Sequence, residues 1–130
     1  MVIIINGLTL AYIGDAYYEL KIRNYLVSLG ITNVNKLHKL SIKYVSAKAQ
    51  AEAIKYLINN NLLDDTEIEY YKLGRNKASI RNGIDANLYR HATGFESLIG
   101  YLSLNNLIRC DKIIEITISY LSEGDWDGKK

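Results

Sequence analysis

Residues 7–29 have the sequence GLTLAYIGDAYYELKIRNYLVSL, and this stretch decides the fold class of the chain. Its apolar residues recur at intervals of three and four, which is the spacing that places side chains on one face of an α-helix. Gly30 follows directly, as is typical of a helix end. The stretch therefore predicts a long amphipathic helix. Its apolar face is expected to consist of Leu8, Ala11, Tyr12, Tyr18, Ile22, Tyr25, Leu26 and Leu29.

The rest of the chain continues the helical pattern. Residues 75–87 lack this periodicity and contain Gly83, so we expect a loop there. The chain has no proline and only 9 glycines, which is unusual for a β-sandwich or barrel with many turns. The expected fold class is therefore all-α. Further helices are predicted over residues 40–58, 64–74, 88–106 and 110–121, with one or two helical turns at 33–38.

The composition is that of a single folded domain. A length of 130 residues is typical of one domain, and we expect it to span residues 1–122, followed by a polar tail at 123–130. The apolar content of 48% and the charged content of 23% exclude general disorder. The single cysteine, Cys110, excludes an intrachain disulfide and a zinc site built from several thiolates. No apolar run approaches the ~20 residues that cross a bilayer, and the first five residues are a poor signal peptide. We therefore expect a soluble, cytoplasmic protein with no membrane partner.

The net charge of +2 conceals two basic segments. Residues 36–55 contain five lysines and one acid, and residues 72–91 contain five lysines or arginines and one acid. Such segments on a nearly neutral chain favour the binding of a polyanion. For residues 36–55, the solvated face of an amphipathic helix is an equal alternative. Arg75, Lys77 and Arg81 lie in the expected loop, so their charges are not explained as the solvated face of a helix. Binding of a polyanion is therefore the favoured interpretation for them.

Asp15 falls where the helical pattern predicts an apolar residue. It lies between Ala11 and Tyr18 on the expected apolar face, directly after Gly14. A carboxylate on a buried face costs on the order of several kcal/mol unless a cation or hydrogen bonds satisfy it. A glycine inside a helix costs about 1 kcal/mol relative to alanine. Two adjacent departures from local rules are typical of functional or strained sites.

Glu96 shows the same anomaly in a later helix. It lies at the edge of the apolar face, and Gly94 and Gly100 on either side allow another helix to come close. Two interpretations remain open for these acids. In one, Asp15 and Glu96 each pair with a basic residue such as Arg23 or Arg90. In the other, the two helices pack together and the acids share a divalent cation, for which oxygen ligands completed by water favour Mg²⁺.

Four sequence blocks resemble the ribonuclease III family, and in particular its Mini-ribonuclease III branch. The block AYIGDAYYE at residues 11–19 resembles the signature helix of the catalytic domain, and ATGFESLIGY at 92–101 resembles its second catalytic helix. The blocks SAKAQA at 46–51 and GRNK at 74–77 resemble the Mini branch. The four blocks occur in the order of the family, and the resemblance covers about residues 8–122.

The resemblance implies an all-helical, homodimeric endonuclease that uses Mg²⁺ to cleave double-stranded RNA. It implies that Asp15 and Glu96 are the catalytic residues and bind the metal. It also implies maturation of the 5′ and 3′ ends of the 23S ribosomal RNA precursor, without an appended RNA-binding domain. Where larger ribonuclease III enzymes carry further acids, this chain has Leu8, Ala11 and Thr93. Water and RNA phosphate are therefore expected to supply more of the metal shell.

Duplex RNA is recognised largely by shape, through phosphates and 2′-hydroxyls, and a mobile basic loop suits this task. The expected RNA-binding residues are Arg75, Asn76, Lys77, Arg81 and, in the other basic segment, Lys48. Two other functions remain as alternatives: a non-catalytic helical RNA-binding or scaffold protein with the same fold, and a helical interaction module with no RNA role. The retention of both acids argues against the first, and the basic segments and the four blocks argue against the second.

Overall fold

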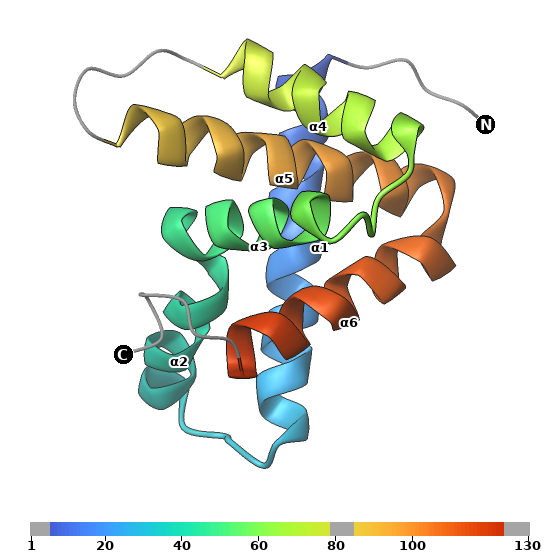
Figure 1. Cartoon of the computed structure of the whole chain (residues 1–130). Coiled ribbons are helices and arrows are strands. Elements are labelled where there is room, and N and C mark those ends of the chain that lie inside the picture. The colour runs from blue at the N-terminus through green and yellow to red at the C-terminus, as the bar shows by residue number, and fades with distance from the viewer. Residues whose placement is uncertain (1–5, 79–84, 124–130) are drawn as a thin grey trace.

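The structure is a computed structural model that describes residues 6–78 and 85–123. Within these residues the chain forms six α-helices and no strand (Figure 1), so the predicted all-α class is confirmed. In the same part of the chain, no helix combines the length and the apolar character that a membrane span needs. The helices are α1 (Gly7–Ser28), α2 (Val34–Val45), α3 (Ala47–Asn59), α4 (Asp65–Lys77), α5 (Ala86–Asn105) and α6 (Leu107–Glu123).

Helix α5 is the centre of the fold. Helices α1, α3 and α4 pack directly against it, and α6 follows it after Asn106 (Figure 1). Residues 92–100 are all buried except Glu96. Among them, Phe95 meets the Tyr18 ring of α1 edge to face, with 5.0 Å between the ring centroids. A helix whose side chains are apolar or small on nearly all sides is a core helix. The sequence predicted a single apolar face for this helix, and that face was too narrow.

Glycines let the backbones of α1 and α5 touch. A Cβ atom at Gly14 would overlap the backbone carbonyl oxygen of Glu96, and a Cβ atom at Gly100 would overlap a backbone carbonyl oxygen of α1. Helix α4 contacts α5 in the same way, because a Cβ atom at Gly94 would lie 2.8 Å from the backbone oxygen of Tyr71. The expectation that Gly94 and Gly100 allow close helix packing is confirmed, and each of them serves a different neighbouring helix.

The buried face of α1 differs from the predicted one. Leu8, Tyr12 and Leu29 are exposed, although the apolar spacing placed them on the buried face. The buried face is rotated about the helix axis relative to the predicted one. Glycines make its closest contacts, and a pattern of apolar residues does not count them. Asp15 therefore lies beside the buried face and is exposed, and is not on the face as expected. The buried residues of α1 are Gly7, Leu10, Ala11, Gly14, Tyr18, Ile22 and Leu26.

Several predicted helix boundaries were wrong. The expected helix over 40–58 is divided at Ser46, whose backbone is extended (ψ 156°) and whose hydroxyl accepts a hydrogen bond from the Ala49 N–H at 3.2 Å. Ser46 thus ends α2 and caps α3, and the short turn expected at 33–38 is the start of α2. Helix α4 continues past Gly74 because this glycine packs against α5 and does not end the helix. Helices α5 and α6 begin slightly earlier than predicted.

An ion pair between a buried carboxylate and a partly exposed arginine joins α4 to α6. The Arg109 guanidinium donates hydrogen bonds to both carboxylate oxygens of Glu67, at 2.7 and 2.9 Å, and to the Leu62 backbone oxygen at 2.7 Å. Glu67 is only 2% exposed and also accepts the Asp64 N–H in a capping box. This bidentate arrangement satisfies a carboxylate that would otherwise be costly to bury.

Replacing Gly14 with alanine is expected to destabilise the protein, although alanine is the better helix former. The added Cβ overlaps the Glu96 carbonyl oxygen, and overpacking of this kind costs about 1–3 kcal/mol of unfolding free energy. Ala16→Gly, at an exposed position of the same helix, is the matched control and should cost only about 1 kcal/mol through helix propensity. Urea denaturation measures both variants. A Gly14→Ala protein as stable as wild type, or more stable, would show that helix propensity outweighs the close contact.

Candidate active site

The crossing of α1 and α5 places Asp15 next to Glu96. Asp15 directly follows Gly14, which lies against the Glu96 backbone. Glu96 is half-buried and is the residue of the 92–100 run whose side chain reaches the surface, whereas Asp15 is exposed. The structure therefore brings together the two carboxylates that the sequence singled out, although they lie far apart in the chain.

The two carboxyl groups interact strongly. The pKa of Glu96 is raised to about 8, first by burial, then by its hydrogen bond with Asp15 and by the negative charge of Asp15. Glu19, one turn beyond Asp15, adds a smaller repulsion that also raises this pKa. Hydrogen bonding to the Gln50 side chain lowers it. At neutral pH and without a cation, the pair of carboxyl groups therefore retains a proton.

The alternative that each acid pairs with a basic residue is not observed. Arg23, one of the two suggested partners, instead lies 3.6 Å from the Glu19 carboxylate. Among residues 6–78 and 85–123, neither Asp15 nor Glu96 forms an ion pair. The same residues contain no group of three or more His, Cys, Asp and Glu side chains placed to hold a metal ion. The described part of the chain thus offers two neighbouring carboxylates and no third metal-binding side chain.

Gln50 is a polar residue of this site that the sequence reasoning missed. It lies on α3, is 2% exposed, and donates from Nε2 to the Val45 backbone oxygen at 3.2 Å. Its side chain also lowers the pKa of the Glu96 carboxyl group, against the larger effects of burial and of Asp15. Its Oε1 has no hydrogen-bond partner in the described structure. The sequence does contain a signal, because Gln50 precedes Ile54 by four residues and Leu57 by seven, which is the spacing of a core position.

The expected RNA-binding residues Arg75, Asn76 and Lys77 lie in the last turn of α4 and not in a loop. Asn76 and Lys77 are exposed, and the Arg75 guanidinium lies over the Tyr71 ring at 5.4 Å from its centroid. Cations in the last turn of a helix are stabilised by the helix dipole, which is consistent with the helix continuing through them. Arg81 lies outside the described residues, so its position stays untested.

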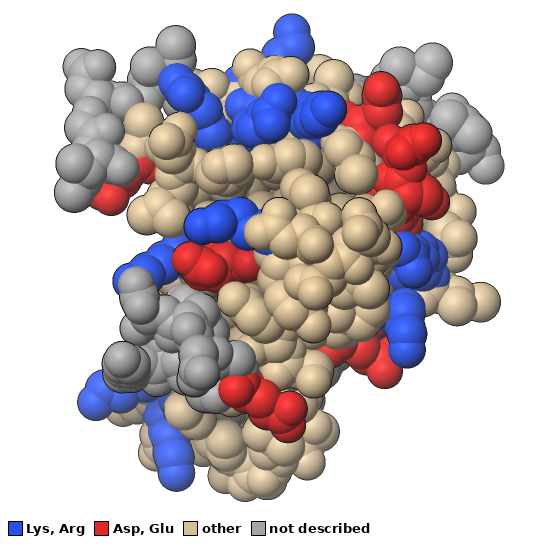
Figure 2. Space-filling view, viewed as in Figure 1, with Lys and Arg blue, Asp and Glu red and all other residues tan. Residues whose placement is uncertain are grey.

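The basic surface extends from α4 onto α5. Figure 2 shows lysines and arginines gathered over α4 and α5, with acidic side chains at the start of α4. Lys48 is exposed on α3. Arg90, which the sequence offered as a partner of the acids and counted toward the basic charge of its segment, borders the same surface as Arg75. A cavity of about 430 Å³ there is lined by Arg75, Asn76, Ala78, Asn87, Arg90 and His91.

His91 also borders this cavity. Its pKa is lowered by burial and by the positive charges of Arg75 and Lys55. Its Nδ1 lies 2.6 Å from the Tyr71 hydroxyl, and the two rings are stacked. The contact with Tyr71 fixes the ring against α4, which gives His91 a packing role beside the basic surface.

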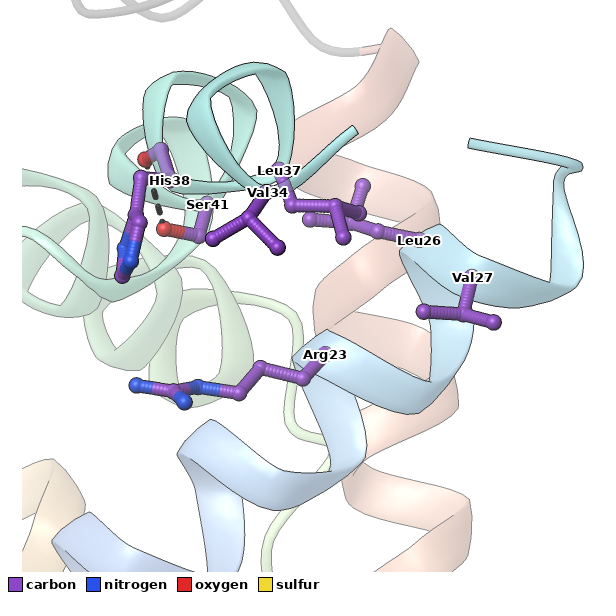
Figure 3. Close-up of a pocket in the computed structure, with 7 residues that line it drawn as sticks. All are labelled: Arg23, Leu26, Val27, Val34, Leu37, His38 and Ser41. Carbon is purple, nitrogen blue, oxygen red and sulfur yellow. Dashed lines mark hydrogen bonds between the residues drawn. The ribbon is translucent and has the colours of Figure 1, made fainter. Parts of the chain in front are cut away.

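A second cavity, of about 230 Å³, lies between the later turns of α1 and helix α2. Figure 3 shows the aliphatic side chains of Leu26, Val34 and Leu37 gathered on one side of it, with Arg23 and His38 on the other. Asp15 and Glu96 are not among its lining residues. This cavity is therefore separate from the acidic pair.

The fold and the acidic pair define a helical domain of the ribonuclease III type. The sequence profile of the Ribonuclease III domain family matches residues 8–107, a range that contains both acids. Mini-ribonuclease 3 of Acholeplasma laidlawii is 47% identical over 124 residues, covering 95% of this chain and 99% of that relative. Mini-ribonuclease 3 of Enterococcus faecalis is 52% identical over 102 residues, covering 77% of each chain. The chain belongs to the Mini-ribonuclease III family and is an endoribonuclease.

A solved structure has the same architecture. The crystal structure of a protein from Fusobacterium nucleatum superimposes with a TM-score of 0.76 and is 34% identical in sequence. The match covers 88% of this chain and 92% of that chain. The arrangement of helices that brings α1 and α5 together is therefore shared with an experimentally solved protein.

The metal-free protein is expected to lose stability as the pH rises from about 4.5 to 8. The Glu96 pKa is about 8 in the folded chain against an ordinary value of 4.5, so the folded chain keeps a proton that the unfolded chain releases. The stabilisation that this proton gives is complete below the Glu96 pKa of the unfolded chain. It is lost as the pH rises through the Glu96 pKa of the folded chain. Glu96→Gln removes this dependence.

Urea denaturation in EDTA at pH 5, 7 and 8.5 tests this expectation. The unfolding free energy of Glu96→Gln relative to wild type should grow with each step in pH. Glu115→Gln, at an exposed position of α6, is the matched control and should show no such trend. A difference between Glu96→Gln and wild type that does not change with pH would contradict the interaction of Glu96 with Asp15.

Proposed function

We propose that this endoribonuclease hydrolyses phosphodiester bonds of double-stranded RNA, with Mg²⁺ held by Asp15 and Glu96. The observation that supports the proposal is the proximity of the two carboxyl groups at the crossing of α1 and α5, where burial and then the neighbouring Asp15 raise the Glu96 pKa to about 8. Mg²⁺ prefers oxygen ligands and usually keeps several waters, so one or two carboxylates suffice to hold it. The pair of acids at the crossing of α1 and α5 fits this requirement.

The chain supplies few oxygen ligands beyond this pair. At the positions where larger ribonuclease III enzymes have further acids, Leu8 is exposed and Ala11 is buried. The Thr93 hydroxyl is buried and donates to the Tyr89 backbone oxygen at 2.8 Å. These three side chains leave the acidic pair without additional carboxylates. We therefore assign the remaining coordination to water and RNA phosphate.

The two acids have different tasks. When bound, Mg²⁺ lowers the pKa of a coordinated water and offsets charge on the scissile phosphate. Glu96 is half-buried and fixed by the backbone contact with Gly14, so it provides a rigid ligand. Asp15 is exposed and lies on the solvent side, where a substrate arrives. Both carboxylates must be ionised to bind a cation, so metal binding releases the proton that the pair retains.

We assign duplex binding to Arg75, Asn76 and Lys77, together with Arg81 and with Lys48 of α3. The exposure of Asn76, Lys77 and Lys48 supports this assignment. Phosphate contacts supply most of the affinity of proteins for duplexes, and arginine and lysine are the side chains that make them. The end of α4 offers such side chains at the surface.

The substrate that we propose is the precursor of 23S ribosomal RNA, whose 5′ and 3′ ends the enzyme matures in the cytoplasm. This proposal rests on membership of the Mini-ribonuclease III family. We take residues 1–122 as the catalytic domain and residues 123–130 as a tail. The alternative, a non-catalytic RNA-binding or scaffold protein, is weakened because both carboxylates are present and in contact.

Asp15→Asn and Glu96→Gln are each expected to reduce duplex cleavage at least about 100-fold, because each removes a charged ligand of the proposed metal. Duplex binding and folding should persist. A long RNA duplex is incubated with each protein, with and without Mg²⁺, and cleavage and gel mobility are compared. Glu115→Gln, at an exposed position of α6, is the matched control. A duplex that the wild type shifts but never cuts would favour the scaffold alternative, and no shift and no cleavage would favour the interaction module.

We also propose a homodimer, because one acidic site cuts one strand and a two-fold axis supplies a second site for the other. Light scattering should give about twice the chain mass of 14.8 kDa. Mixing wild type with an excess of Asp15→Asn should convert double-strand cuts into nicks, since mixed dimers retain one intact site. A clean monomer that cuts both strands would contradict the dimer.

Replacing Lys77 with alanine is expected to weaken duplex binding regardless of sequence. Each lost phosphate contact should flatten the slope of log affinity against log salt by about 0.7–0.9. Arg75→Ala combined with Lys77→Ala should roughly double this change. Lys112→Ala, an exposed lysine of α6, is the matched control and should leave the slope unchanged. Binding is measured in Ca²⁺ to limit turnover, and an unchanged slope in the double variant would direct attention to residues 36–55.

A further inference from the structure

The cavity between the end of α4 and the start of α5 combines cationic and amide side chains. It has a volume of about 430 Å³, and five of the six described residues that line it are polar or basic. None of the six is acidic, and Asp85, which precedes α5, is not among them. The polar and basic residues are Arg75 and Asn76 of α4 and Asn87, Arg90 and His91 of α5. Such a lining offers N–H donors and no carboxylate, which suits an anion.

The positive charge of this cavity is not neutralised by the fold. Among residues 6–78 and 85–123, every ion pair uses a cation other than Arg75 and Arg90. Burial lowers the pKa of His91, and the positive charges of Arg75 and Lys55 lower it further. The wall of the cavity therefore carries a positive potential, which favours an anionic ligand.

Tyr71 holds two of the lining side chains in place. Its ring is 3% exposed and packs against α5 at Gly94, where a Cβ atom would lie 2.5 Å from the ring. The Arg75 guanidinium lies over the ring, 5.4 Å from its centroid, and the Tyr71 hydroxyl lies 2.6 Å from His91 Nδ1. A cation and an imidazole held by one buried ring lose little freedom when a ligand binds, which favours affinity.

We propose that this cavity is a phosphate pocket, in which the Arg75 guanidinium from α4 and the Arg90 guanidinium from α5 clamp one phosphate group of RNA. The Asn87 amide adds a neutral donor at the rim, where it is exposed. A guanidinium group can bind phosphate with two parallel hydrogen bonds, so two arginines fix the position of the group as well as its charge. A fixed phosphate sets the register of the enzyme on the RNA.

The inference deepens the proposed function and rests on it for the source of the phosphate, which is RNA. It turns part of a basic surface into one discrete site, and it assigns binding to Arg90 and Asn87 as well as Arg75. The phosphate group is either a diester within the backbone or a monoester at a strand end. Both offer the oxygen atoms that two guanidinium groups bind.

Inorganic phosphate alone is the first probe. The chain has two histidines, so His38→Gln, at an exposed position of α2, leaves the imidazole signals of His91 alone. This protein is labelled with ¹⁵N-histidine and titrated with phosphate in EDTA, without RNA, at constant pH and ionic strength. The His91 signals should shift and saturate. Adding Arg90→Gln should raise the phosphate concentration at the midpoint at least about 10-fold, through the loss of charged hydrogen bonds.

Two further variants control this titration. Lys112→Gln removes an exposed lysine of α6 and should leave the midpoint unchanged. Arg90→Lys keeps the charge without the planar group, so its midpoint should lie between those of the parent protein and Arg90→Gln. An unchanged midpoint in Arg90→Gln, or His91 signals that chloride shifts as phosphate does, overturns the pocket. If Arg90→Gln fails to fold, Arg75→Gln tests the clamp from α4, and an unchanged midpoint there also overturns it.

Two RNA duplexes of one sequence then identify the source of the phosphate. One has 5′-hydroxyl ends and the other has 5′-phosphate ends, and each is added in EDTA, which removes divalent metal. A backbone diester in the pocket makes both duplexes shift the His91 signals equally and compete with inorganic phosphate. A terminal monoester makes only the phosphorylated duplex do so. Competition by neither duplex overturns the inference that the pocket binds a phosphate group of RNA.

The outcomes separate this inference from the proposed function. Phosphate binding that Arg90→Gln weakens, in a protein that binds the duplex and never cuts it with Mg²⁺, overturns the proposed hydrolysis and leaves the pocket standing. Cleavage that depends on Mg²⁺, in a protein whose His91 signals ignore phosphate, overturns the pocket alone.

Discussion

Direct contact between the backbones of α1 and α5 is the constraint on which the rest of the structure depends. Gly14 and Gly100 carry no Cβ atoms, so each lies against a carbonyl group of the opposite helix. The rotated buried face of α1 and the burial of α5 on nearly all sides follow from this approach. The Tyr18 and Phe95 rings then fill the space beside the crossing. Main-chain geometry thus brings Asp15 to Glu96.

The site illustrates how a protein maintains an unfavourable arrangement. Burial of Glu96 and its contact with Asp15 raise the Glu96 pKa to about 8, which costs stability at neutral pH. The described structure offers no basic side chain to relieve this repulsion. Favourable contacts elsewhere offset the cost, among them the bidentate pair of Glu67 and Arg109. Perturbed carboxyl groups of this kind are typical of acid pairs that bind cations.

Much of the fold could be predicted from the sequence because helical periodicity is a local property. The all-α class and the packing of helices beside Gly94 and Gly100 followed directly from residue spacing. The buried face of α1 could not be predicted in this way, since an apolar pattern gives no weight to Gly14. The break at Ser46 was missed because one serine cap interrupts an otherwise continuous apolar spacing. The same pattern misread Gly74 as a helix end, although this glycine packs against α5.

The glycines and the acids carry separate kinds of information. Every replacement of Gly14 or Gly100 adds a Cβ atom that would overlap backbone atoms of the facing helix. The architecture therefore restricts these two positions, independently of the function of the chain. Asp15 and Glu96 are under no such steric restriction, because their side chains reach the surface. A homologous chain that had lost its chemistry could keep both glycines while its acids drifted. The glycines therefore diagnose the architecture, and only the acids beside them diagnose the proposed metal-binding site.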